Sequence, residues 1–153
     1  MAIFDALFEL SDDQDIGANS ASSTEASTHV INFTQSDLEM GAGEPLWLNV
    51  RMGTEALLST GAATLTVALC RDTDGTVDSS STVIYQTGAI AKATLVAGYP
   101  ILRMPLPYNV DEDAYVGLLY TIGAHASTAG TVDAFIDHGP QSSYDTQVSA
   151  SNI

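Results

Sequence analysis

The chain has 153 residues, of which 19 are acidic and four are basic, so its formal net charge at pH 7 is −15. A surface this negative repels nucleic-acid phosphates and anionic lipid headgroups, and we therefore expect neither nucleic acid nor a membrane as a partner. A single domain of this length buries enough apolar surface to fold without disulfides, which suits a chain whose one cysteine is Cys70.

Residues 1–28 are predicted to form an N-terminal arm followed by an acidic and Ser/Thr-rich connector. The apolar start fits a short amphipathic helix almost as well as a strand, and Gly17–Thr28 has little to bury and is predicted to be a loop. Such an arm either docks on a neighbouring molecule or forms the first strand of its own domain, and the sequence leaves both interpretations open. Its apolar residues are Ile3, Phe4, Leu7, Phe8 and Leu10.

Residues 29–140 have the pattern of an antiparallel β-domain, and residues 141–153 form a polar C-terminal tail. Apolar and polar residues alternate in several short runs, which are separated by Gly, Pro and Asp. About eight such runs with few helical stretches predict an all-β fold, an antiparallel β-sandwich or jelly roll of about eight strands with an N-terminal arm. The predicted strands are His29–Phe33, Leu46–Met52, Ala63–Cys70, Thr82–Gln86, Ala91–Val96, Ile101–Leu106, Tyr115–Ile122 and Thr131–His138.

The segment DTDGTVD is the best candidate for a metal site. It places three carboxylates, Asp72, Asp74 and Asp78, around Gly75, and such a group can converge on a hard cation such as calcium. The distal glutamate and the helix of an EF-hand are absent. The alternative interpretation is a solvated hairpin with a tight turn at Asp74-Gly75, because Asp and Gly both favour turn conformations. Apart from this candidate calcium ion, we expect no cofactor.

Signals for catalysis are sparse, and we predict that the protein is not an enzyme. The three histidines lack metal-ligand spacing, and no nucleophile elbow, phosphate-binding loop or dinucleotide fingerprint occurs. Glycoside hydrolysis requires paired carboxylates, but some of the 19 acidic residues are expected to pair in space by chance. The histidines are His29, His125 and His138.

Aromatic side chains support a second hypothesis, a carbohydrate-binding β-sandwich module. A row of exposed rings would suit a sugar-binding face. Most of the aromatic residues lie within predicted strands, however, where packing in the core or on the sheet is their commoner use. Tyr108 and Tyr144 lie in predicted loops and are better placed for contact with a partner.

Five segments, Leu7–Gln14, Met40–Val50, Ala63–Leu69, Gly98–Arg103 and Gly130–Ile136, occur in an order and pattern that point to a known family. Over most of its length the chain resembles the jelly-roll cement, or decoration, proteins of tailed-bacteriophage capsids. The Gly-Glu-Pro-Leu step before a strand is the most specific of these features, whereas the others are general β patterns.

This resemblance implies a non-enzymatic structural protein on the outer surface of the virion. It would bind the major capsid protein, bridge neighbouring subunits and stabilise the mature shell, and shell symmetry implies a homodimer or homotrimer. The expected capsid or inter-subunit contacts are Ile3, Phe4, Leu7, Phe8, Tyr108 and Tyr144. The docking face is expected to be the least acidic one, with the four basic residues and the apolar N-terminal arm nearer the partner than the acidic loops. The basic residues are Arg51, Arg71, Lys92 and Arg103.

Overall fold

The computed structural model describes residues 6–17, 20–33, 45–107 and 115–138, which form ten β-strands and one 3-10 turn, η1 (Ala6–Phe8). Every strand pairing is antiparallel, so the predicted all-β antiparallel fold is confirmed. Among the described residues, no helix has the length and apolar character needed to cross a membrane. The strands are β1 (Glu9–Asp15), β2 (Thr24–Ala26), β3 (Ile31–Asn32), β4 (Trp47–Met52), β5 (Thr64–Asp72), β6 (Thr82–Gln86), β7 (Ile90–Ala91), β8 (Pro100–Pro105), β9 (Tyr115–Gly123) and β10 (Thr131–Asp137).

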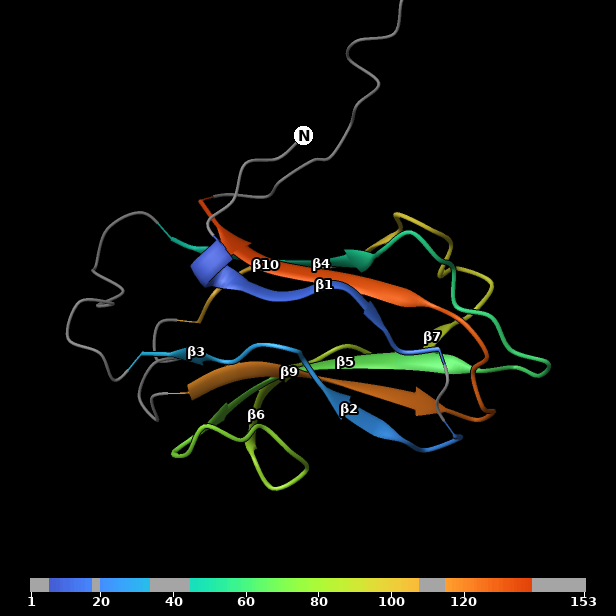
Figure 1. The fold of residues 1–153 in the computed structure, drawn as a ribbon, viewed down its shortest axis with the longest axis horizontal. Coiled ribbons are helices and arrows are strands. Elements are labelled where there is room, and N and C mark those ends of the chain that lie inside the picture. The colour runs from blue at the N-terminus through green and yellow to red at the C-terminus, as the bar shows by residue number, and fades with distance from the viewer. Residues whose placement is uncertain (1–5, 18–19, 34–44, 108–114, 139–153) are drawn as a thin grey trace, which may run out of the picture.

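The strands form two layers that pack face to face (Figure 1). One sheet has the order β1-β10-β4-β8 and the other has the order β2-β9-β5-β6, while the two-residue strands β3 and β7 pair with β9 and β5. When β3 and β7 are set aside and the other eight strands are counted along the chain, the two orders become 1-8-3-6 and 2-7-4-5. This arrangement is that of a jelly roll, as the sequence predicts.

The hydrophobic core lies between the sheets and is built by the period-two alternation of the strands. On β4, Val50 is buried and faces the other sheet, and the register places it opposite Ala134 of β10 and Leu102 of β8. The central strands β5 and β9 supply the opposite wall through their alternate residues. These are Leu65, Val67, Leu69, Val116, Leu118, Tyr120 and Ile122.

A buried hydrogen bond connects the two sheets through the core. The hydroxyl of Tyr120, a residue 1% exposed, lies 2.8 Å from the Oγ of Ser11 on β1. Ser11 donates its own proton to Gln14 Oε1 at 2.7 Å, so the tyrosine hydroxyl is the donor in the first bond. Burial raises the pKa of Tyr120, which keeps this donor protonated.

The segment that was expected to be an arm and a connector contributes a strand to each sheet. β1 pairs with β10, and β2 pairs with β9, so the sheets begin at Glu9 rather than at residue 29. The physical reason is that Leu10 and Ile16 are fully buried in the core, while the buried Ser11 between them is hydrogen-bonded to Tyr120. Of the two interpretations of the chain start, the described residues support a first strand packed on its own domain.

Two further predictions are wrong in detail. Of the predicted strand Ala91–Val96, the structure retains Ala91 alone, as the end of β7, because the chain turns at Lys92 to bury Leu95 completely. Asp74-Gly75 does not form a tight turn either, since β5 and β6 are joined by residues 73–81. The C-terminal tail lies outside the described residues.

Candidate functional site

The connection between β5 and β6 does not gather its carboxylates around a common centre. Asp72, Asp74 and Asp78 each accept a hydrogen bond from a backbone N–H one or two residues further along the chain, at 2.7, 2.8 and 2.7 Å. Bonds from the hydroxyls of Ser81 and Ser80 are the largest causes of the lowered pKa values of Asp72 and Asp78. Within the described part of the chain there is no group of three His, Cys, Asp or Glu side chains that could hold a metal ion. The calcium hypothesis therefore lacks the geometry it requires.

The connection between β5 and β6 instead covers the outer face of the sheet that contains these two strands. Val77 is 4% exposed and forms a small apolar cluster with Cys70 of β5 and Leu119 of β9, on the side away from the main core. A Cβ at Gly117 would lie 3.0 Å from Val77 Cγ2, so the absence of a side chain there admits the valine. Burial beneath the loop raises the pKa of Cys70 to about 11, which makes its thiol inert at neutral pH.

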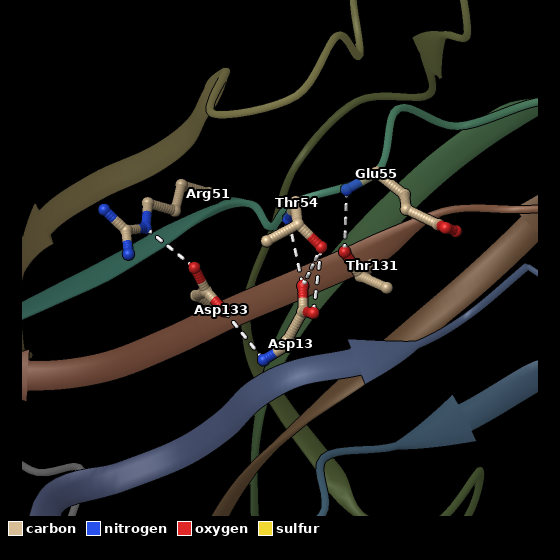
Figure 2. Close-up of polar contacts among 6 residues, drawn as sticks. All are labelled: Asp13, Arg51, Thr54, Glu55, Thr131 and Asp133. Carbon is tan, nitrogen blue, oxygen red and sulfur yellow. Dashed lines mark hydrogen bonds and ion pairs between the residues drawn. The ribbon is translucent and has the colours of Figure 1, made fainter.

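A second polar cluster lies on the outer face of the sheet β1-β10-β4-β8, where it fastens the edge strand β1 to its neighbours (Figure 2). Asp13 lies in an irregular part of β1 with a φ of 43°. Its carboxylate accepts bonds from the Thr54 N–H and hydroxyl, both at 2.9 Å. Its own N–H donates to Asp133 Oδ1 at 2.7 Å, and Asp133 Oδ2 accepts from Arg51 Nε at 2.9 Å. The cluster joins β1, β4 and β10 and neutralises the charge of Arg51.

The backbone around Gly53 explains how Asp13 reaches this position. A Cβ at Gly53 would lie 2.4 Å from Asp13 Oδ1 and 2.6 Å from Thr131 Oγ1, so only glycine leaves room for both. The Thr131 hydroxyl is the largest cause of the lowered pKa of Asp13, followed by the Thr54 N–H. Asp13 therefore stays ionised and bonded across the pH range in which most proteins work.

The four basic residues do not gather on one face. Arg51 and Arg103 lie on the neighbouring strands β4 and β8, whereas Arg71 lies at the end of β5 in the other sheet and Lys92 follows β7. Arg51 is engaged by Asp133, and Lys92 donates to the backbone carbonyl of Ser59. Arg103 is exposed on an edge strand. The four basic residues therefore do not mark one face, and their expected position nearer the partner than the acidic loops stays a prediction.

The predicted contact residues are placed only in part. Leu7 in η1 is 75% exposed, while Phe8 packs partly against the core. Ile3, Phe4, Tyr108 and Tyr144 lie outside the described residues. Leu7 is thus the one member of the predicted set that the structure places at the surface as a contact would require.

Acidic residues, in contrast, are distributed unevenly. The chain from residue 79 to residue 110 contains no Asp or Glu and carries Lys92 and Arg103. The structure describes residues 79–107 of this stretch, the acid-free segment, which contains β6, β7 and β8. The acidic edge, made of β1 and β2, carries Glu9, Asp12, Asp13, Asp15 and Glu25.

These two regions lie on opposite sides of the sandwich. β1 and β2 end their sheets on one side, where Gln14 of β1 donates to the Ala26 carbonyl of β2. β8 and β6 end the same two sheets on the other side, so the acid-free segment supplies both far edges. The sequence contains this signal as a gap between Asp78 and Asp111, although the fold is needed to show that the gap becomes one side of the molecule.

The aromatic side chains do not form a sugar-binding platform in the described residues. Tyr120 is buried in the core, and Trp47, Tyr99 and Tyr115 are half-buried on different strands or loops. Tyr85 on β6 is 40% exposed. The carbohydrate hypothesis therefore finds no row of exposed rings here.

A model of the family described as Bbp16 matches residues 10–136, which include nearly all of both sheets. No curated protein was found to match the chain.

Proposed function

The chain belongs to the Bbp16 family, and from that premise we propose that it is a capsid decoration, or cement, protein of a bacteriophage. In this function it binds the outer surface of the virion shell, bridges subunits of the major capsid protein and stabilises the mature capsid. It also associates with copies of itself, and it catalyses no reaction.

The observation that carries the proposal is the separation of the acidic edge from the acid-free segment. A protein that coats an assembled shell needs one side that approaches other protein surfaces and another that faces solvent. The strands β6 and β8 carry no acidic residue, so they approach a protein surface with less like-charge repulsion than β1 and β2 do, while the acidic edge keeps the coated particle soluble. The jelly-roll fold and the resemblance of the five sequence segments to decoration proteins support the same assignment.

The proposed shell contact lies on β8, the far edge of the first sheet. Arg103 is exposed there, opposite Asn49 in the register with β4, and it forms no ion pair among the described residues. Pro100 and Pro105 lack backbone N–H groups, so this edge suits side-chain contact better than addition of a strand. Many identical contacts on one lattice need only modest individual affinity.

Co-sedimentation with expanded shells tests this function. The wild-type protein is expected to pellet with shells, and Arg103→Glu is expected to remain largely in the supernatant. The matched control is the double variant Thr24→Glu and Thr28→Glu, which changes the net charge equally but places it beside the acidic edge, at two exposed positions. Wild-type protein that stays soluble beside mature shells contradicts the proposal. If the protein stays soluble and binds glycans, the alternative is favoured, a carbohydrate-binding β-sandwich module of a phage fibre or spike.

A further inference from the structure

The four edges of the two sheets differ in how they resist pairing with another strand. An open strand edge is a template for another chain, and proteins block it with charge, proline, bulges or short length. β1 carries four acidic residues and two register shifts, and β8 carries Arg103, two prolines and one register shift. β2 and β3 contain three and two residues. These three edges are well protected.

β6 is the exception. Its sequence, Thr-Val-Ile-Tyr-Gln, contains no charged residue and no proline, and β-branched and aromatic residues predominate. It ends the sheet order β2-β9-β5-β6, so one side of its backbone has no strand partner in the described part of the fold. A single bulge, at Ile84, interrupts its pairing with β5. Val83 and Tyr85 are 49% and 40% exposed.

We propose that β6 is the interface between two copies of this chain, which lie with their β6 strands antiparallel around a two-fold axis near Ile84. Two molecules with a net charge of −15 repel each other, so they can meet most easily along a strand that itself carries no acidic residue. β6 is the part of the acid-free segment that also presents an unprotected edge and two exposed apolar side chains. A two-fold contact uses the same patch on both copies, as an uncharged strand permits.

The acidic connection that precedes β6 explains the antiparallel arrangement. Asp72, Asp74 and Asp78 lie near the beginning of β6, whereas Lys92 follows β7 further along the same edge of β5. In a parallel arrangement the two acidic connections would lie side by side. In the antiparallel one they are separated by about the length of the strand, roughly 17 Å, which exceeds the Debye length of about 8 Å at physiological salt. The acidic connection between β5 and β6 of each copy then lies toward the end of the other copy's edge at which Lys92 is found.

This inference rests on the self-association that forms part of the proposed function, but its test needs no shells. Sedimentation equilibrium over a wide dilution series is expected to show a monomer–dimer equilibrium for the wild-type protein. Tyr85→Lys and Val83→Lys each place two extra charges in the interface and are expected to raise the dimer dissociation constant about tenfold or more. The matched control, Val96→Lys, makes the same kind of change at a residue 55% exposed outside β6 and is expected to leave the constant unchanged.

A charge exchange tests the orientation. Lys92→Glu is expected to weaken the dimer, and the addition of Asp74→Lys is expected to restore part of the lost affinity. Near-ultraviolet circular dichroism and a cooperative melt show which variants fold. If Val83→Lys does not fold, Tyr85→Lys alone tests whether β6 is the dimer interface. A dimer that survives both β6 substitutions overturns the inference, as does a protein that is monomeric at every concentration.

The two proposals fail in distinguishable ways. If the protein dimerises through β6 but does not pellet with shells, the β6 interface stands and the decoration function is contradicted. A monomer that pellets with shells, and loses this binding in Tyr85→Lys, overturns the self-association and assigns β6 to the shell.

Discussion

Truncation of Val77 to alanine tests whether the connection between β5 and β6 is a structural cover rather than a ligand loop. Val77 is 4% exposed and packs on Cys70 and over Gly117. The substitution removes two buried methyl groups, worth about 0.8 kcal/mol each in transfer free energy, and leaves a small cavity. We therefore expect the free energy of unfolding to fall by about 2 kcal/mol, and Tm by about 4–8 °C.

The thiol of Cys70 reports on the same cover. A buried thiol reacts with a labelling reagent when the structure above it opens, and weakening of the cover by about 2 kcal/mol raises the open population about thirtyfold. Labelling of native protein by an aromatic disulfide, followed by absorbance, should accelerate by that factor in Val77→Ala. The matched control is Val96→Ala, because Val96 is 55% exposed and lies outside the cover. Wild-type stability and a wild-type labelling rate in Val77→Ala would show that this connection is not a structural cover.

Four other perturbations have expected outcomes. Tyr120→Phe removes the hydroxyl that lies 2.8 Å from Ser11 Oγ, and urea unfolding should show a loss of about 1 kcal/mol, which a prior Ser11→Ala substitution should largely abolish. Gly53→Ala should cost about 1–3 kcal/mol, because its Cβ would meet the Asp13 carboxylate at 2.4 Å, and Ala62→Ser at an exposed position is the control. Calcium at millimolar concentration should leave Tm unchanged relative to chelator, since Asp72, Asp74 and Asp78 are bonded within their own loop; a clear rise would restore the metal hypothesis. Burial raises the pKa of Cys70 from 9.0 to about 11, so the thiol loses its proton more readily in the unfolded chain than in the folded one. The free energy of unfolding should therefore fall as pH rises from 9 toward 11. Cys70→Ala should remove that part of the alkaline loss of stability.

The strands that alternate strongly were predictable because each carries its own burial pattern. β6 coincides with its predicted bounds, and β4, β5, β8, β9 and β10 differ from theirs by at most two residues at an end. The fold class was predictable as well, since a chain of about eight short strands with frequent breaks is typical of a sandwich or jelly roll. Local alternation was therefore enough for the central strands.

β1 and β2 could not be assigned in the same way, because what holds them is distant in sequence. Ser11 bonds to Tyr120, and Asp13 bonds to Thr54 and is approached by Thr131. The acidic composition of this segment suggested solvent, yet its outward-facing carboxylates are used to fasten an edge strand. Similarly, Ser27 in the predicted loop is buried, and its Oγ accepts the Leu118 N–H at 3.0 Å.

The candidate sites were harder to predict than the fold. The spacing of Asp72, Asp74 and Asp78 fits either cation binding or turn formation, and the hydrogen-bond partners of the carboxylates were needed to distinguish them. The acid-free segment is visible in the sequence, but its importance depends on β6 and β8 ending different sheets on the same side. A linear charge count cannot show that relation.

A reconstruction of mature shells incubated with this protein, at side-chain resolution, would show whether the protein coats the shell and through which side. We expect density on the outer surface, with the β8 edge and Arg103 toward the major capsid protein and the acidic edge of β1 and β2 toward solvent. Undecorated shells, or copies bound through the acidic edge, would contradict this expectation.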